Sequence, residues 1–351
     1  MNFKIGNSII SDNSKVFIIA ELSANHNQNF DIAVKTIKAA KESGADAIKI
    51  QTYTPDTITL DCKNDYFKIN QGTIWDGKYL YDLYKEAYTP WDWQPELKRI
   101  AESEGLIFFS TPFDFTAVDF LEKMNVPAYK IASFEITDIP LIEYIAQKQK
   151  PVIISTGIAT LEDIELAVET CKKAGNKKIA LLKCTSSYPA PIEEANLKTI
   201  PDMKKRFKTI IGLSDHTIGD TIAITSVALG AKIIEKHFIL DRKTGGPDST
   251  FSMEPKEFKN MVKSIRDAES ALGEINYNLS EQDKKNRQFS RSLFVIKDIK
   301  KGEIFTTENV HSIRPGYGLH PKFYKEILGK KVNSDIKMGT PLSFSYIEID
   351  K

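Results

Sequence analysis

Short apolar segments alternate with amphipathic segments eight times along residues 16–272 of this chain. Each apolar segment spans five to eight residues. After a connecting segment of variable length, it is followed by a segment whose apolar residues recur at helical spacing. Continuous apolar strands that alternate with helices form a parallel sheet covered on both faces. The predicted strands are residues 16–21, 45–51, 106–110, 128–132, 151–155, 178–183, 209–214 and 231–238.

Eight strand–helix units in succession predict an α/β protein with a closed (β/α)₈, or TIM, barrel. A doubly wound open sheet is the alternative architecture. It is disfavoured because no G-x-G-x-x-G motif follows the first predicted strand. The predicted helices are residues 30–43, 95–104, 116–124, 140–147, 161–174, 197–207, 220–229 and 255–272.

The chain has 351 residues, which exceeds the roughly 250 of a bare barrel. Residues 52–90 form a long insertion after the second strand, which we expect to lie over the carboxyl ends of the strands and to be functional or mobile. We assign residues 1–275 to the barrel, 276–290 to a polar linker and 291–351 to a small β-rich domain. About 60 residues make a marginal core, so we expect this domain to pack against something else.

Two segments of the small domain resemble each other: DIKKG at 298–302 and DIKMG at 335–339. Both predict a strand, a turn and a second strand. Ordinary Lys-Gly turns are an equally good interpretation of either segment alone, but together with the preceding polar linker they indicate a compact β-rich unit.

Composition excludes several classes of partner. Lys+Arg 48 against Asp+Glu 47 gives a net charge of +1, which provides no global field for nucleic acid or an anionic membrane. No apolar run approaches the ~20 residues of a membrane span, and the N-terminus does not resemble a signal peptide. Three cysteines without a CxxC pair fit a reducing compartment. We therefore expect a cytoplasmic protein with neither nucleic acid nor membrane as a partner.

Polar residues gather where the predicted strands end, and in a barrel these ends converge on one face that carries the active site. Lys49 and Lys130 lie in or near buried strands, where an ammonium group is costly unless paired. Two lysines with several hydroxyls suit a phosphate and a carboxylate. A salt-bridged structural lysine and a Schiff-base lysine are the alternatives. The strand-end residues include Glu21, Gln51, Thr111, Ser133, Glu135, Ser155, Ser186, Tyr188, Ser214 and Glu235.

His216 and His237 end adjacent predicted strands, near the carboxylates of Glu21, Asp215 and Asp248. This set indicates a divalent metal site, and we favour Mn²⁺ or Mg²⁺ over structural zinc because no thiolate other than that of Cys184 is near. Two satisfied polar histidines without a metal are the alternative interpretation.

An ordered series of motifs closely resembles the sialic acid synthase family over essentially the whole chain. The C-terminal segment resembles that family's antifreeze-like (SAF) domain, with IRPG at 313–316 at its centre. The motifs are AE at 20–21, NHN at 25–27, IKIQ at 48–51, STPF at 110–113, YKIAS at 129–133, STG at 155–157, GLSDH at 212–216, EKHF at 235–238 and GPD at 246–248.

The resemblance implies an enzyme that condenses phosphoenolpyruvate with an amino-sugar aldehyde to give a nine-carbon 2-keto acid and phosphate. It also implies a domain-swapped homodimer in which the small domain of one chain covers the barrel mouth of the other. His216 and His237 would bind the metal. The implied catalytic residues are Glu21, Lys49, Lys130 and Asp248. The implied substrate-binding residues are Gln51, Thr111, Ser133, Glu135, Ser155, Ser186, Tyr188, Ser214 and, from the partner chain, Arg314.

Two stretches, at 184–189 and 245–255, resemble the pseudaminic acid branch of this family. Neuraminate synthases typically carry Asn after the Cys-Thr pair, where this chain has Ser186. The acceptor of the branch is 2,4-diacetamido-2,4,6-trideoxy-L-altrose. Three alternatives stay open: a neuraminate or legionaminate synthase, a metal-dependent or Schiff-base aldolase that uses pyruvate, and a non-enzymatic protein that binds sugar or ice surfaces.

Overall fold

The structure, a computed structural model, describes residues 2–348. The chain divides into two compact units, Met1–Gly273 and Glu274–Lys351, and each is described by itself. Within the described residues, no helix is both long and apolar enough to cross a membrane.

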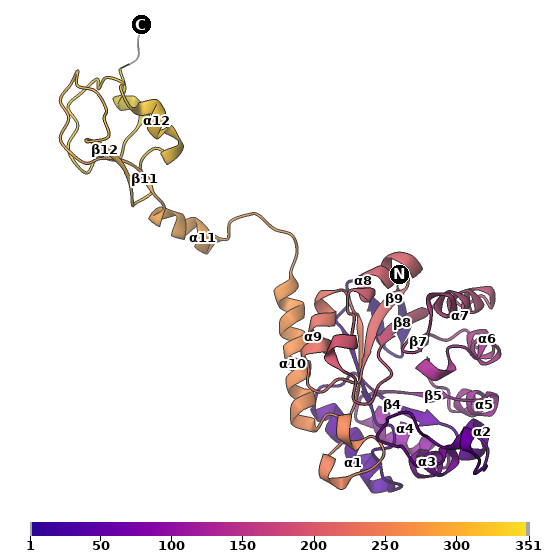
Figure 1. The fold of residues 1–351 in the computed structure, drawn as a ribbon. Coiled ribbons are helices and arrows are strands. Elements are labelled where there is room, and N and C mark those ends of the chain that lie inside the picture. Colours follow the sequence, from indigo (N-terminus) through magenta and orange to yellow (C-terminus); the bar gives the residue numbers. More distant parts are fainter. Residues whose placement is uncertain (1, 349–351) are drawn as a thin grey trace. The chain divides into compact units, whose positions relative to one another are not determined.

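Eight parallel strands of the first unit close into a barrel in the order β10-β3-β4-β5-β6-β7-β8-β9, which confirms the predicted architecture (Figure 1). The barrel interior and the layer between strands and helices form one continuous apolar core. The strands are β3 (Phe17–Glu21), β4 (Ala47–Thr52), β5 (Ile107–Pro112), β6 (Tyr129–Ile131), β7 (Val152–Ser155), β8 (Ile179–Cys184), β9 (Ile210–Asp215) and β10 (Ile233–His237).

Eight helices cover the barrel, and their ends follow local sequence rules. In α7, Thr160 and Asp163 form a capping box at the start of the helix. Lys172 and Lys173 occupy its last turn, where positive charges interact favourably with the helix dipole. These helices are α1 (Phe30–Glu42), α4 (Gln94–Ser103), α5 (Phe115–Lys123), α6 (Ile139–Gln147), α7 (Leu161–Lys173), α8 (Thr199–Phe207), α9 (Thr221–Ala228) and α10 (Pro255–Leu272).

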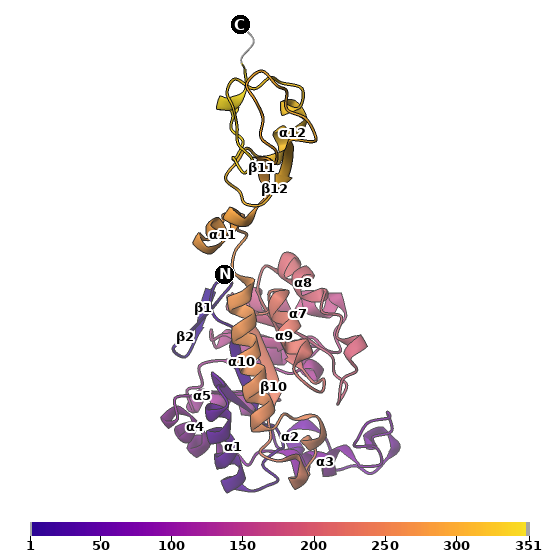
Figure 2. The same cartoon turned by 90° about the vertical axis from the view of Figure 1, so that its left-hand side faces the viewer.

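Two parts of the barrel unit carry elements that the sequence analysis did not predict. An antiparallel hairpin, β1 (Asn2–Ile5) with β2 (Ser8–Ser11), lies against Ile107 at the start of β5. The segment 52–90 contains α2 (Pro55–Ile58) and α3 (Leu80–Ala87), and its Trp75 donates a 2.9 Å hydrogen bond to the carbonyl of Pro247, beyond the end of β10. Figure 2 shows the hairpin and the α2–α3 segment at opposite ends of the barrel unit.

The second unit begins with residues that we interpreted as a linker. They include a short helix, α11 (Glu281–Asn286), which begins at a Ser280–Asp283 capping box. A small β-rich core follows, around the antiparallel pair β11 (Ser292–Val295) and β12 (Val310–Ile313), with α12 (Tyr324–Ile327) packed against it.

The two similar segments of the second unit pair with each other. Ile299 and Ile336 exchange backbone hydrogen bonds of 2.9 and 2.8 Å. Lys300 forms a 2.7 Å ion pair with Asp335, and Lys337 forms one of the same length with Asp298. Their sequence similarity therefore reflects a local two-fold arrangement of two equivalent turns.

Candidate active site

Two lysines and two glutamates meet inside the barrel at the carboxyl ends of four strands. Lys49 Nζ of β4 lies 2.5 Å from Glu21 Oε2 of β3 and 3.7 Å from Glu235 Oε1 of β10. Lys130 Nζ of β6 lies 3.2 Å from the same oxygen of Glu235. All four side chains are buried. Because a buried ammonium group is costly unless paired, Glu235 acts as the shared counter-charge of the two lysines.

The environments of the two glutamates push their pKa values apart. Burial raises the pKa of Glu21 to about 7, although the ammonium group of Lys49 acts in the opposite direction. Burial also opposes ionisation of Glu235, but the charges of Lys130 and Lys49 outweigh it and lower the pKa of Glu235. Near neutral pH, Glu21 is therefore poised to hold or release a proton, whereas Glu235 stays a carboxylate.

Hydroxyl groups lie beside this charged cluster. Lys49 Nζ donates a 3.1 Å hydrogen bond to Thr111 Oγ1 of β5. Ser214 Oγ of β9 lies 3.5 Å from Glu235 Oε1. Both contacts follow from strand alternation, which points every second residue into the barrel.

Gly157, just after β7, lies beside two more serines. A Cβ atom at this position would lie 2.0 Å from Ser186 Oγ and 2.8 Å from Ser133 Oγ, so a larger residue would displace these hydroxyls. The amide of Gly157 donates a 3.0 Å hydrogen bond to Ser133 Oγ. Ser155 Oγ is buried and has no hydrogen-bond partner among residues 2–348. A buried hydroxyl without a partner, in a barrel that also holds two lysines, fits an anion oxygen.

The rings of His216 and His237 lie side by side, with their centroids 5.3 Å apart. His216 Nδ1 lies 3.0 Å from the carbonyl of Thr185, and in the neutral ring a hydrogen bond from Nδ1 to this carbonyl leaves Nε2 as an acceptor. His237 Nδ1 is buried without a hydrogen-bond partner within the described residues, and it lies 3.9 Å from Asp248 Oδ2. Burial lowers the pKa of His237 well below its usual range, which keeps the ring neutral as a metal ligand must be.

His216 and His237 are the side chains of the site that could hold a divalent metal ion. Among residues 2–348, no group of three His, Cys, Asp or Glu side chains is placed to enclose a metal. An ion held by these two histidines alone would need its remaining ligands from substrate or water oxygens.

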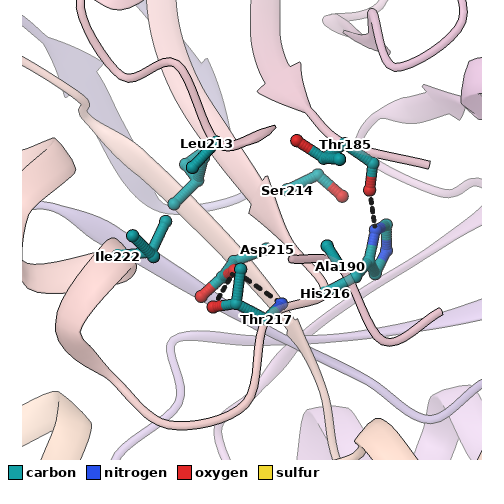
Figure 3. A pocket seen from close by; sticks show the side chains of 9 residues that line it. Thr185, Ala190, Leu213, Ser214, Asp215, His216, Thr217 and Ile222 are labelled. Atoms are coloured by element: carbon teal, nitrogen blue, oxygen red, sulfur yellow. Dashed lines mark hydrogen bonds between the residues drawn. The ribbon is translucent and has the colours of Figure 1, made fainter. Parts of the chain in front are cut away.

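A small cavity of about 10 Å³ lies next to His216, lined in part by Thr185, Leu213 and Ile222 (Figure 3). The adjacent turn is held by Asp215, whose Oδ1 accepts hydrogen bonds of 2.9 and 2.8 Å from the amide and hydroxyl of Thr217. The ammonium group of Lys236 lies 2.7 Å from Asp215 Oδ2. This buried ion pair joins the residue before His216 to the residue before His237.

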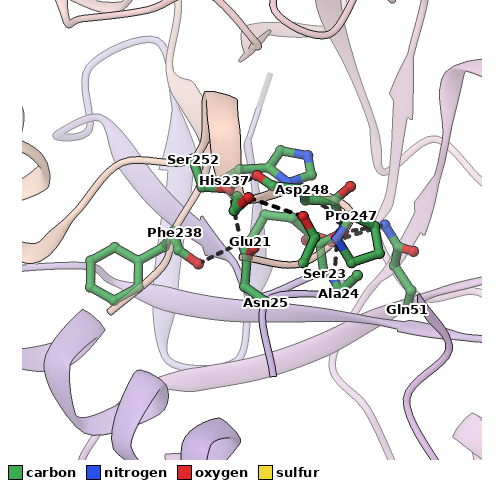
Figure 4. Close-up of polar contacts among 12 residues, drawn as sticks. Glu21, Ser23, Ala24, Asn25, Gln51, His237, Phe238, Pro247, Asp248 and Ser252 are labelled. Atoms are coloured by element: carbon green, nitrogen blue, oxygen red, sulfur yellow. Dashed lines mark hydrogen bonds and ion pairs between the residues drawn. The ribbon is translucent and has the colours of Figure 1, made fainter. Parts of the chain in front are cut away.

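A chain of hydrogen bonds links Glu21 to Asp248 through Gln51 and Ser23 (Figure 4). Gln51 Nε2 donates 3.2 Å hydrogen bonds to Glu21 Oε1 and to Ser23 Oγ. The Ser23 hydroxyl in turn donates to Asp248 Oδ2. Burial raises the pKa of Asp248, while the hydrogen bond from Ser23 opposes that change.

Aromatic side chains cover the histidines. The ring of Tyr188, after β8, packs against His216 at a tilt of 46° with ring centroids 4.4 Å apart, and the ring centroid of Phe251 lies 4.9 Å from that of His237. Trp75 of the 52–90 segment lies 5.6 Å from Tyr188. The long insertion therefore contributes to the wall of the site at the carboxyl ends of the strands, where we expected it.

Comparison with protein families gives two matches: a model described as the NeuB family at residues 36–277, and one described as the SAF domain at residues 290–348. The chain belongs to the NeuB family.

Individual members are similar to this chain over nearly its full length. It is 51% identical to a pseudaminic acid synthase of Campylobacter jejuni over 339 residues, which cover 97% of this chain and 98% of the relative. It is 38% identical to an N,N'-diacetyllegionaminic acid synthase of Legionella pneumophila, over 95% and 94% of the two chains. A solved N-acetylneuraminic acid synthetase of Leptospira borgpetersenii, in complex with citrate, aligns with a TM-score of 0.73 and 33% identity over 82% and 95% of the chains.

The geometry of this NeuB-family barrel brings most of the predicted site residues together. The Oε2 atom of Glu135 is buried without a hydrogen-bond partner among the described residues, and burial raises the pKa of Glu135 to about 7, although the charge of Lys130 acts in the opposite direction. Arg314 belongs to the second unit, so its predicted role stays a prediction.

Sequence reasoning missed three contributors to the site. Glu235 was noted only as a strand-end residue, Gly157 only as part of a motif, and Ser23 received no role. The available signal for Glu235 was its position two residues before His237, on the same face of a strand.

Proposed function

We propose that this chain is a pseudaminic acid synthase. It would condense phosphoenolpyruvate with 2,4-diacetamido-2,4,6-trideoxy-L-altrose and water to give the nine-carbon 2-keto sugar acid and phosphate. The observation that carries the proposal is the buried pair Lys49 and Lys130 beside a set of hydroxyls, which suits a small substrate that carries a phosphate and a carboxylate. The higher identity to a pseudaminic than to a legionaminic acid synthase supports the choice of acceptor.

Phosphoenolpyruvate would bind along β4, β6, β7 and β9. Lys49 and Lys130 offset the charges of its phosphate and carboxylate, and Ser133, Ser155 and Ser214 donate hydrogen bonds to the oxygens, with Ser186 nearby. Of these serines, Ser155 carries a hydroxyl that no described residue satisfies, which leaves it available for a substrate oxygen.

The acceptor sugar would lie on the other side of the cluster, against Gln51, Thr111, Glu135, Tyr188 and Asp248. Tyr188 presents an aromatic face next to His216, which suits the apolar face of a sugar ring. Asp248 and Gln51 are already hydrogen-bonded through Ser23, so they form one preorganised polar edge.

His216 and His237 would hold Mn²⁺ or Mg²⁺. Such an ion, when bound, supplies a Lewis acid for the carbonyl oxygen of the open-chain acceptor. His216 is oriented for this role by the Thr185 carbonyl, and the Asp215–Lys236 pair holds the two strand ends that carry the ligands.

In the proposed reaction, the electron pair of the C2=C3 double bond of phosphoenolpyruvate forms a bond from C3 to the aldehyde carbon of the acceptor. The aldehyde oxygen takes up a proton, and C2 is left as a cation. Water then adds to C2, and the resulting tetrahedral carbon expels phosphate with cleavage of the C–O bond. Glu21 lies beside Lys49 and has a pKa of about 7, so it is suited to hold or release the proton of the attacking water.

Reaction in ¹⁸O-labelled water tests both the substrate and the bond that breaks. Phosphate and keto acid should appear in equal amounts, with the label in the keto acid and none in the phosphate. Product incubated alone in labelled water corrects for exchange of the keto oxygen. Labelled phosphate, or phosphate without keto acid, would contradict the proposed reaction.

We also propose a domain-swapped homodimer in which Arg314 of the partner chain reaches the acceptor's N-acyl group. The small apolar core of the second unit, which is marginal for independent stability, supports such an arrangement. The boundaries 1–275, 276–290 and 291–351 and a cytoplasmic location belong to the same proposal. The three cysteines are free thiols, as a reducing compartment would keep them.

A further inference from the structure

Ser23 adopts a backbone conformation that its residue type disfavours. Its φ angle is +47°, in the left-handed region where a residue that carries a Cβ atom is strained. The residue is buried, two positions after the end of β3. Glycine would adopt this conformation freely. Strain of this kind persists where the surrounding structure enforces it, and it concentrates at functional sites.

The hydroxyl group of Ser23 connects two polar groups of the site. It donates to Asp248 Oδ2 and accepts a 3.2 Å hydrogen bond from Gln51 Nε2 (Figure 4). Asp248 Oδ2 also accepts a 3.3 Å hydrogen bond from the amide of Ala24. No hydrogen bond to the other carboxylate oxygen, Oδ1, is found among residues 2–348, so one oxygen is fixed by the protein and the other is left for a ligand.

The loops around Ser23 are held together without it. Asn25 Nδ2 donates hydrogen bonds of 3.0 Å to the carbonyl of Phe238 and 2.8 Å to Ser252 Oγ. Asn27 Nδ2 donates 3.2 Å hydrogen bonds to the carbonyls of Thr244 and Gly245. These bonds already join the β3–α1 loop to the β10–α10 loop, so loop docking does not explain a serine at position 23.

We infer that Ser23 is a positioning residue for the acceptor sugar: its hydroxyl fixes Asp248 so that Oδ1 accepts a hydrogen bond from an acceptor hydroxyl or amide. The inference rests on the proposed function for the identity of the acceptor. The Ser23 hydroxyl is joined to Lys49 through Gln51 and Glu21 rather than directly, so we expect it to act on the sugar and not on phosphoenolpyruvate. The strained left-handed backbone of Ser23 places this hydroxyl between Gln51 and Asp248.

Two substitutions separate the hydroxyl from the backbone. Ser23→Ala removes the hydroxyl and keeps the strained side chain, whereas Ser23→Gly removes the hydroxyl and relieves the strain. We expect both variants to raise KM for the acceptor at least about tenfold, as for a lost hydrogen bond to a charged group. KM for phosphoenolpyruvate should stay within about twofold of wild type, and Ser23→Gly should unfold at a higher urea concentration than Ser23→Ala.

Asn125→Gly is the matched control, because Asn125 also has a left-handed backbone (φ +52°) but lies in the exposed turn between α5 and β6. It should change the urea midpoint without changing either KM. If Ser23 acts through Asp248, Ser23→Gly combined with Asp248→Asn should be no worse for the acceptor than Asp248→Asn alone.

Retention of wild-type acceptor KM by Ser23→Gly would overturn the inference, because a purely structural serine can be replaced by glycine at this backbone conformation. A double variant whose losses multiply fully would also overturn it. Failure of the proposed function is distinguishable, since wild-type enzyme would then show no turnover of phosphoenolpyruvate with this acceptor.

Discussion

Replacing Glu235 by Gln should destabilise the ligand-free protein and strengthen its response to an anion. The carboxylate lies 3.2 Å from Lys130 Nζ and 3.7 Å from Lys49 Nζ, and all three groups are buried. At an effective dielectric constant of about 20, these separations correspond to about 5 and about 4 kcal/mol of gross attraction. Glu21 still pairs with Lys49, and removing one partner of a buried ion pair costs about 3–5 kcal/mol, so we expect a loss of about 3 kcal/mol.

Urea unfolding at pH 7.5 measures this loss. Addition of phosphoenolpyruvate should then raise the melting temperature of the Glu235→Gln variant more than that of wild type, because the two ammonium groups have lost their counter-charge. Glu96→Gln, which breaks an exposed i,i+3 pair with Arg99, is the matched control and should change neither quantity resolvably. A variant as stable as wild type, or one that responds less to phosphoenolpyruvate, would refute the assignment of Glu235 as counter-charge of an anion site.

Three further predictions concern other residues. Burial holds the pKa of Glu135 at about 7, above its unfolded value of 4.5, so the folded wild type binds the extra proton between these pH values and loses stability as pH rises through them. The free energy of unfolding of Glu135→Gln, relative to that of wild type, should therefore rise by about 1 kcal/mol or more between pH 4.5 and pH 7.5, as measured by urea unfolding. A difference between the two proteins that does not change with pH would contradict this. His237→Ala should lose Mn²⁺ affinity in calorimetry while its circular dichroism is unchanged, and undiminished binding would reject the metal site. Arg314→Ala should raise KM for the acceptor and leave KM for phosphoenolpyruvate unchanged, and equal effects on both would contradict a contact with the sugar.

The regular part of the fold can be predicted from the sequence because each barrel strand is a continuous apolar run. Such a run can be recognised from its own residues, without knowing which strands lie beside it. The run at 151–155, for example, became β7 (Val152–Ser155). The hairpin β1–β2 and the helix α2 were not predicted because elements of four residues are too short to show a hydrophobic periodicity.

The candidate site was partly predictable for a similar reason. Strand-end position alone placed Lys49, Lys130, His216 and His237 on one face of the barrel. The importance of Glu235 depends on a contact with Lys130, which lies 105 residues away on a strand that is not its neighbour in the barrel. The importance of Ser23 depends on a φ angle and on a loop that returns 225 residues later. Such pairings are set by barrel closure and loop docking, which no local pattern encodes.

A comparison of acceptors tests the proposed function most directly. Purified protein with Mn²⁺ and phosphoenolpyruvate would be given 2,4-diacetamido-2,4,6-trideoxy-L-altrose, the legionaminate precursor or N-acetylmannosamine, and phosphate release would yield kcat/KM for each. The trideoxy-L-altrose acceptor should be preferred by at least about tenfold, which corresponds to about 1.4 kcal/mol of differential transition-state binding. Equal or greater kcat/KM with either other acceptor, or turnover of pyruvate in place of phosphoenolpyruvate, would contradict the assignment.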